Sequence, residues 1–380
     1  MNMEFRDLKK QYAVLKTEID AGIAEVLASA RFISGPQVKE LEQRLADYVG
    51  VKHCISCANG TDAITLGLMA WGIGEGDAVF VPDFTFFSSG ECPAYAGATP
   101  IYVDVERDSF NLDPEKLEAA IQAVLAQGKY TPRAVIAVDL FGRPADYSRI
   151  RPICDKYGLY LLEDGAQGFG GAIDGKMACS FGDISTTSFF PAKPLGCYGD
   201  GGAIFTDSDE WAAMIRSLTV HGKNGSDKYD NIRIGMNSRL DTLQAAILLP
   251  KLEAFRRYEV ADVNAAAANY TARLEGSCLE LPRNPQGVVS SWAQYTVILP
   301  EQVDRAALQA KLKEAGIPTM VYYAKPMHLQ GAFTGTDSAL ADCPVTEYLC
   351  SHVLSLPIHP YLEDADIELV CRTLLECIDG

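Results

Sequence analysis

Between residues 53 and 206 the sequence alternates short apolar stretches with segments whose apolar residues recur at helical spacing. The predicted strands are 53–57, 78–82, 100–105, 133–140, 159–163, 184–189 and 202–206. The predicted helices between them are 60–71, 88–95, 114–125 and 146–157. Because this alternation favours parallel pairing, it predicts an α/β fold in which helices cover both faces of a central, mostly parallel sheet.

Helical spacing also predicts two helices ahead of this region, at 4–30 and 36–50, which form an arm that packs on a partner subunit or on the chain's own core. A long helix is expected at 241–275. A helix is predicted at 210–220, before the long helix. The C-terminal part is predicted to contain strands 295–299 and 319–323 and helices 305–315, 338–350 and 364–377. We therefore predict a large domain, residues 1–255, and a smaller α+β domain, residues 256–380. The polar segment 222–236 is rich in turn residues and predicts a mobile surface loop.

Composition and charge exclude several classes of protein. A net charge of −17 disfavours binding to nucleic acid or to an anionic membrane surface. No secretion signal begins the sequence, and no apolar run approaches the ~20 residues that span a bilayer. The 11 cysteines, an odd number, indicate reduced thiols and a cytoplasmic protein. Cys54 and Cys57 form a CxxC pattern inside a strand-like stretch, so we expect buried thiols there and no bound metal.

Polar residues follow three of the predicted strands, at 59–61, 83–85 and 164–167. Ligands gather at the carboxyl ends of strands in such sheets. Asp164 directly follows a buried strand, and Gln167 follows it after about one helical turn. An acid at this position commonly caps a helix. A buried carboxylate could equally hold the proton on a heterocyclic nitrogen, and the glycines around it, Gly165 and Gly168 among them, would leave room for a flat ligand.

Lys193 lies between Pro191 and Pro194 in a glycine-rich loop. Each proline fixes its own φ, and Pro194 pushes Lys193 toward extended backbone, so the amine is carried by a stiff segment. Taken alone, an exposed lysine on such a loop is the commoner case. The presence of Asp164 upstream favours a functional lysine over a plain exposed one. A cationic ring held by Asp164, together with partial burial, would favour the neutral, reactive amine over the protonated one.

Other residues fit the same ligand. Asn59, Gly60 and Thr61 stand between a strand and a helix, where backbone N–H groups and a hydroxyl make an anion site or an ordinary helix cap. Phe86 is either a stacking partner for a flat ring or plain core. Arg239, just before the long helix, either belongs to a helix-capping segment or offers a guanidinium to a phosphate or carboxylate.

Together these features resemble the DegT/DnrJ/EryC1/StrS family of nucleotide-sugar aminotransferases, which use pyridoxal 5'-phosphate (PLP) and have the fold-type I architecture. The motifs that carry the resemblance run over nearly the whole chain: Asn59-Gly-Thr-Asp-Ala63, Glu163-Asp-x-Ala-Gln167, Ser188-Phe-Phe-Pro-x-Lys193-x-Leu-Gly196, Gly199-Asp-Gly-Gly202, Gly235-Met-Asn-Ser-Arg-Leu-Asp241 and Pro326-Met-His-Leu-Gln330. The presence of Lys193 favours amino transfer, because family members that dehydrate sugars carry histidine there.

The resemblance implies roles for four residues around the ring of the cofactor. Lys193 would bind the cofactor covalently and later shuttle a proton, and Asp164 would pair with the pyridine nitrogen. Gln167 would contact the side of the ring that carries the hydroxyl, and Phe86 would stack on the ring face. Three nearby residues depart from the family pattern: Gly165, Gly168 and Asp139. Asp139 stands where many relatives have histidine.

The resemblance also implies where the phosphate lies. Gly60, Thr61 and Ser188 would hold it, and Asn237 would contact it from the neighbouring subunit. The protein would therefore be a homodimer whose active sites lie at the interface, acting on glutamate and a nucleotide-linked keto-sugar for polysaccharide or O-antigen synthesis.

Within the family the similarity is greatest to enzymes that aminate UDP-2-acetamido-2-deoxy-3-oxo-glucuronate at C3. In those relatives an arginine matching Arg239 and a histidine at the position of Tyr322 engage the uronate carboxylate, and His328 is a further expected substrate contact. Because Tyr322 replaces that histidine, a sugar that is neutral at C6 stays open, as does a C4 aminotransferase acting on a UDP- or dTDP-4-keto-6-deoxy sugar.

Two other classes of protein are alternatives to this enzyme. A non-catalytic PLP-binding regulator is a distant alternative, which the intact lysine, aspartate and glutamine disfavour. A nicotinamide-dependent oxidoreductase needs a glycine fingerprint after its first strand. The glycine-rich segment 72–76 follows a helix instead, so it predicts a helix stop and a turn.

Overall fold

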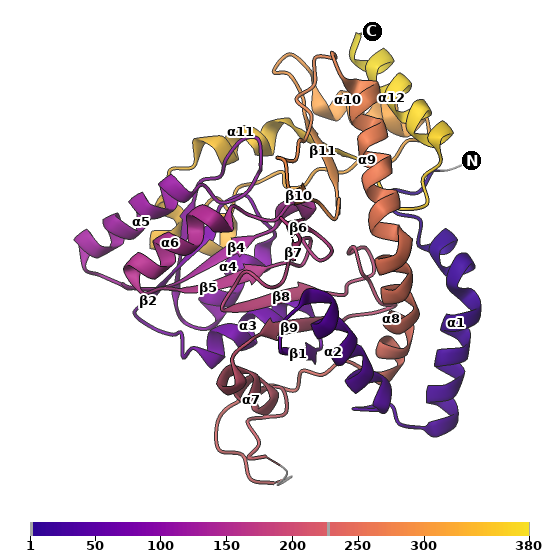
Figure 1. Cartoon of the computed structure of the whole chain (residues 1–380). Coiled ribbons are helices and arrows are strands. Elements are labelled where there is room, and N and C mark those ends of the chain that lie inside the picture. Colours follow the sequence, from indigo (N-terminus) through magenta and orange to yellow (C-terminus); the bar gives the residue numbers. More distant parts are fainter. Residues whose placement is uncertain (1–2, 226–228, 380) are drawn as a thin grey trace.

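A computed structural model describes residues 3–225 and 229–379. Its central sheet has the strand order β1-β9-β8-β5-β4-β2-β3 (Figure 1). The bounds are β1 His53–Cys57, β2 Asp77–Pro82, β3 Thr99–Val103, β4 Thr131–Val138, β5 Tyr160–Asp164, β8 Ile184–Ser188 and β9 Gly202–Thr206. Neighbouring strands are parallel except at β9, which runs antiparallel to β1 and to β8. The predicted mostly parallel sheet is confirmed.

Helices cover both faces of this sheet, as the alternating pattern predicts. One face carries α3 Gly60–Ala70, α4 Phe87–Tyr95 and α7 Asp209–Leu218, and its core includes Val79, Ile136 and Leu162. The opposite face carries α5 Pro114–Gln127 and α6 Tyr147–Tyr157 over Phe80, Val135 and Leu161, and α2 Pro36–Val49 over Phe205. Cys54 and Cys57 lie buried in β1 as free thiols, as expected.

The N-terminal arm packs on its own chain. Helix α1 Leu8–Ser29 lies alongside α8 Thr242–Ala254 (Figure 1). Ile19 is fully buried there and packs in one cluster with Ile247 and Ala254. The apolar spacing of α1 is therefore satisfied within the subunit.

The long helix predicted at 241–275 contains an irregularity. After α8 the backbone widens into a π-helical segment, η2 Phe255–Glu259, and continues as α9 Val260–Leu274. The widened turn leaves Glu259 buried, with its carboxylate bonded to side chains from other parts of the chain. The π-helical segment begins at the predicted domain boundary, residue 255, and the division into two domains itself stays a prediction.

The C-terminal part has a two-stranded antiparallel sheet, β11 Tyr295–Ile298 with β12 Val353–Leu356. Its helices and 3-10 turns are α10 Arg305–Glu314, η3 Gly331–Phe333, η4 Asp337–Leu340, α11 Pro344–His352 and α12 Asp364–Asp379. The strand predicted at 319–323 is wrong, since only a single bridge joins Met320 to Ser355. The helix predicted at 338–350 is wrong in its first half, where the 3-10 turn η4 ends at Leu340 and residues 341–343 are not helical, and β12 was missed.

Smaller elements complete the fold. A three-stranded sheet of β10 Val288–Val289, β6 Ala172–Ile173 and β7 Lys176–Met177 was not predicted, and η1 Leu140–Gly142 follows β4. In the segment 222–236 one bridge joins Lys223 to Asn231, and residues 226–228 lie outside the described residues. Among the described helices none combines the length and the apolar character needed to cross a membrane.

Candidate active site

The strands β1, β2, β5 and β8 end at the same edge of the sheet, because they run in one direction. Their carboxyl ends carry Asn59, Asp83, Asp164 and Ser188. The parallel arrangement therefore gathers the polar residues singled out in the sequence at a single edge.

The predicted phosphate-binding residues meet at the first turn of α3. The side chain of Asn59 caps this helix by accepting a hydrogen bond from the backbone N–H of Asp62 at 2.8 Å. A Cβ at Gly60 would lie 2.8 Å from the Cβ of Ser188, so only glycine lets the helix start approach β8 this closely. The hydroxyls of Thr61 and Ser188 thus lie beside a helix N-terminus, which attracts anions.

Lys193 lies on the turn that follows β8. Its backbone N–H donates to the carbonyl of Phe190 at 2.8 Å, and the side chain is half-buried. Burial lowers the pKa of the Lys193 amine, the negative charge of Asp164 opposes that shift, and the charge of Arg6 adds to it. The amine is thus shifted toward its neutral, nucleophilic form.

Asp164 is buried at the end of β5. Its Oδ2 accepts a hydrogen bond from the Ser89 hydroxyl at 2.9 Å, and its Oδ1 accepts one from the backbone N–H of Ala166 at 3.2 Å. Burial raises the pKa of this carboxyl, whereas the charge of Lys193 and these hydrogen bonds lower it. A cation beside Asp164 would satisfy the buried charge. Sequence reasoning missed Ser89, since a helix residue 75 positions away carries no local signal.

Gln167 is held in place by two protein partners. Its Oε1 accepts from the backbone N–H of Phe141 at 2.8 Å, and its Nε2 donates to the hydroxyl of Tyr323 at 3.1 Å. Phe86 is 52% exposed, with its ring centroid 6.3 Å from that of Tyr323, so protein atoms cover the residue only in part. Tyr323 was also missed, because the sequence pointed to its neighbour Tyr322.

The glycines around Asp164 make room for protein atoms. A Cβ at Gly168 would lie 2.3 Å from Oδ2 of Asp139, and one at Gly165 would lie 2.5 Å from Sγ of Cys179. The expectation that these glycines leave space for a flat ligand is therefore wrong. Gly168 accommodates a buried acid, Asp139, which interacts with a second buried acid, Glu163, and Gly165 accommodates the Cys179 thiol.

The other predicted site residues lie elsewhere. The Arg239 guanidinium donates to the side-chain carbonyl of Asn237, and both residues are at least partly exposed. Within the described residues no hydrogen bond or ion pair joins either side chain to Lys193, Asp164 or Gln167. Tyr322 is half-buried and packs edge-on against Phe5, with ring centroids 6.3 Å apart.

His328 is buried, and its ring Nδ1 is 2.7 Å from Oδ2 of Asp83. This geometry favours a structural role over contact with a substrate. The fold also brings Cys343 to the pair, so that one ligand atom from each of the three residues lies within 4.8 Å of the others. Spacing along the sequence could not reveal this potential ligand set, because its members are far apart in the chain.

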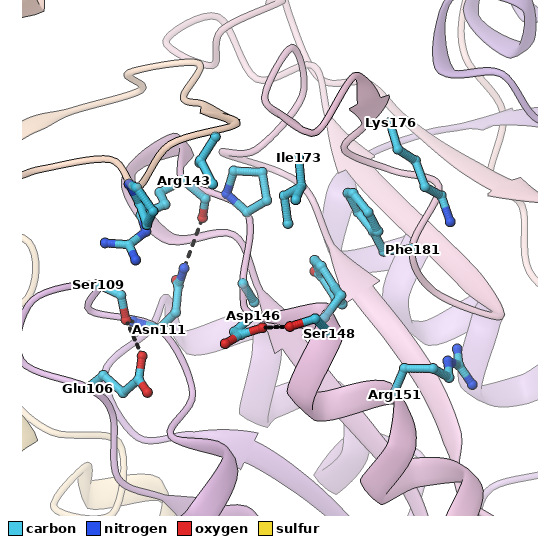
Figure 2. Close-up of a pocket in the computed structure, with 15 residues that line it drawn as sticks. Glu106, Ser109, Asn111, Arg143, Asp146, Ser148, Arg151, Ile173, Lys176 and Phe181 are labelled. Carbon is cyan, nitrogen blue, oxygen red and sulfur yellow. Dashed lines mark hydrogen bonds between the residues drawn. The ribbon is translucent and has the colours of Figure 1, made fainter.

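A cavity of about 510 Å³ lies outside this cluster. Figure 2 shows Arg143 on one side of it and Lys176 and Arg151 on the other, with Ile173 and Phe181 between them. None of the predicted site residues lines this cavity. The candidate active site is defined by its chemistry, an amine and a buried carboxylate at the strand ends, and the size of a cavity does not locate it.

These groups fit pyridoxal 5'-phosphate. An amine with a lowered pKa could bind its aldehyde, a buried carboxylate could pair with its ring nitrogen, and the helix start at Gly60 beside Ser188 could hold its phosphate. The fold and the site define a PLP-dependent aminotransferase of fold type I. The chain belongs to the DegT/DnrJ/EryC1/StrS aminotransferase family, which it matches over residues 14–375.

Relatives extend over the whole chain. It is 48% identical to the UDP-2-acetamido-2-deoxy-3-oxo-D-glucuronate aminotransferase of Pseudomonas aeruginosa, over 98% of this chain and 99% of that one. It is 41% identical to a pleiotropic regulatory protein of Geobacillus stearothermophilus, over 99% and 98%. A crystal structure of a DegT DnrJ EryC1 StrS aminotransferase from Brucella abortus superposes with a TM-score of 0.96, at 46% identity and full coverage of both chains.

The cofactor of this protein is pyridoxal 5'-phosphate. A solved structure of ntda from Bacillus subtilis, 32% identical, contains the cofactor in its PMP form, with a TM-score of 0.87 over 96% of this chain and 82% of that one. Both the family match and this neighbour agree with the residues gathered around Lys193.

Proposed function

We propose that the protein transfers an amino group from glutamate to C3 of a UDP-2-acetamido-3-keto sugar. The observation that carries this proposal is the Lys193 amine on the turn after β8, within the electrostatic influence of the buried carboxylate of Asp164 at the end of β5. The substrate class is supported by the relative from Pseudomonas aeruginosa, which is 48% identical and is named for that reaction.

In this proposal the cofactor supplies an electron sink that stabilises charge on the carbon losing a proton. Asp164 keeps the ring nitrogen protonated, and Ser89 holds the Asp164 carboxylate in position through the 2.9 Å hydrogen bond. Lys193 would take up this proton as the neutral amine and return it as the ammonium group. Gln167 and Phe86 would hold the edge and the face of the ring.

The phosphate is assigned to Gly60, Thr61 and Ser188, with Asn237 contributed by the partner subunit of a homodimer. The exposure of Asn237, and its lack of a contact with its own subunit's Lys193, Asp164 or Gln167 among the described residues, support a role across an interface. We place this homodimer in the cytoplasm, where it would serve polysaccharide or O-antigen synthesis.

The test is amino transfer measured by mass. Purified enzyme is incubated with glutamate and either a UDP-2-acetamido-3-keto sugar or a UDP- or dTDP-4-keto-6-deoxy sugar. Formation of the 3-amino sugar supports the proposal, and formation of only the 4-amino sugar would replace it with the C4 alternative. A protein that binds the cofactor but converts none of these sugars, and does not react with glutamate, would favour the non-catalytic regulator.

A further inference from the structure

Arg6 lies immediately beside the candidate active site, on the segment that precedes α1. Its Nη2 donates a hydrogen bond to the backbone carbonyl of Pro194, 3.0 Å away, and Pro194 directly follows Lys193. The preceding residue, Phe5, packs against the ring of Tyr322. The N-terminal segment therefore contacts both the residue that follows Lys193 and the ring of Tyr322.

The guanidinium of Arg6 is incompletely satisfied. The bond to Pro194 is the one side-chain hydrogen bond that Arg6 makes within residues 3–225 and 229–379, and no carboxylate in those ranges forms an ion pair with it. Glu259 attracts it, but the Glu259 carboxylate takes its hydrogen bonds from Gln11 and Tyr361. A partly buried guanidinium with five donors is expected to bind an anion.

The surroundings keep this cation charged and close to the chemistry. Burial lowers the pKa of Arg6 to about 10, so the side chain stays protonated at neutral pH. Its charge lowers the pKa of Lys193, of Lys251 and of His359, three groups that face it from the lysine loop, α8 and the C-terminal segment. The charge of the guanidinium thus acts on the amine that the proposed reaction uses.

We propose that Arg6 is a specificity-determining residue that binds a carboxylate of the substrate through its planar fork of N–H donors. The inference rests on the proposed function, which supplies two sources of carboxylate: the amino donor and a C6 uronate on the sugar. A bidentate guanidinium–carboxylate pair explains both the free donors and the position next to Lys193.

The test measures binding to the cofactor-loaded enzyme by isothermal titration calorimetry. Glutarate, which has two carboxylates and no amine to react, probes the donor site. UDP-glucuronate and UDP-glucose differ only in the C6 carboxylate and probe the sugar site. We expect Arg6→Met to weaken binding of glutarate or of UDP-glucuronate by at least about tenfold, while UDP-glucose changes less than twofold. The carboxylate that is lost identifies the source.

Matched variants separate recognition from structure. Arg6→Lys keeps the charge without the fork and should lose less affinity than Arg6→Met. Lys9→Met, in the first turn of α1 with an exposed ammonium paired to Glu4, should match the wild type. The proposal is overturned if wild-type enzyme binds neither carboxylate probe, if Arg6→Met leaves both within twofold, or if UDP-glucose weakens equally. If the wild-type enzyme transfers amino groups as proposed and Arg6→Met changes none of these affinities, the inference about Arg6 is refuted and the proposed function still stands.

Discussion

The side-chain amide of Gln167 donates a hydrogen bond to the hydroxyl of Tyr323, and this bond ties the edge of the central sheet to the irregular segment 319–323. Burial raises the pKa of Tyr323, so the hydroxyl stays protonated at neutral pH. Gln167 makes its other hydrogen bond to the backbone of Phe141. Its amide plane is therefore fixed by two protein partners before any ligand binds.

Tyr323→Phe should loosen Gln167 and reduce kcat more than it changes global stability. Removing one partner leaves a buried donor unsatisfied, which costs about 1–3 kcal/mol. We expect kcat to fall by about tenfold or more, in line with an energy of that size. Steady-state kinetics and thermal unfolding check this. Tyr95→Phe, at an exposed residue at the end of α4, is the control, and an unchanged kcat in Tyr323→Phe would show that the bond does not position Gln167.

Gly60→Ala should weaken binding of the cofactor. The added Cβ would lie 2.8 Å from the Cβ of Ser188 and would push the first turn of α3 away from β8. Because the phosphate is expected between them, we predict a cofactor dissociation constant raised by about tenfold or more, measured by reconstitution of the apoenzyme. Gly74→Ala, whose Cβ would lie 3.8 Å from the carbonyl oxygen of Ala96, an ordinary contact distance, serves as the matched control. Equal affinities in the two variants would contradict this placement of the phosphate.

Much of this site could be predicted from the sequence, for a local reason. A few consecutive residues are enough to predict each of three features: the proline-flanked turn at Lys193, the strand that ends at Asp164 and the helix start at Gly60. Ser89, Tyr323 and Arg6 are contributed by remote segments, and their partners are chosen by tertiary packing. The spacing of residues along the chain therefore does not predict such a partner.

The errors in the fold have equally specific causes. The segment 319–323 is apolar enough for a strand, yet only Met320 pairs with another chain segment, so the ladder never extends. The long helix keeps its apolar spacing through Phe255–Glu259, which hides the extra residue of the π-helical turn. The side chain of Asp139 occupies the space that a Cβ at Gly168 would need, so this position requires glycine. The two residues are brought together only by the loops that follow β4 and β5.

Asp139 should make stability depend on pH. Burial and the charge of Glu163 raise the pKa of Asp139 well above its usual range, so the folded state holds a proton that the unfolded state loses above about pH 4. That stabilisation is present at acid pH and is lost as pH rises through the raised pKa. Asp139→Asn keeps a donor without the titration, so its free energy of unfolding should gain on the wild type as pH increases. Urea unfolding at several pH values measures this.

The control for that series is Asp108→Asn, which changes an exposed acid. Its free energy of unfolding should run parallel to that of the wild type. A difference between Asp139→Asn and the wild type that does not vary with pH would show that Asp139 does not hold a proton in the folded state.

Lys251→Met should stabilise the protein at neutral pH. The Lys251 amine is buried and has no hydrogen-bond partner among the described residues, and burial lowers its pKa to about 8. The folded state therefore binds fewer protons than the unfolded state between pH 8 and about 10.4, and stability rises with pH across that window. The gain from the substitution is on the order of 3 kcal/mol below pH 8 and should shrink toward pH 10.

Denaturant unfolding at pH 7 and pH 9.5 measures that gain. The exposed lysine Lys313, replaced by methionine, provides the comparison and should change stability by less than about 0.5 kcal/mol. Destabilisation of Lys251→Met at pH 7 would mean that the amine has a favourable partner that outweighs its burial.

Borohydride reduction of the cofactor-loaded enzyme, followed by peptide mass analysis, tests the central claim most directly. Reduction fixes the cofactor to the amine that holds it. We predict that the added mass appears on the peptide containing Lys193 and that Lys193→Arg enzyme, treated in the same way, carries none at this peptide. A label on another lysine, or an enzyme that is active without modification at Lys193, would contradict the account.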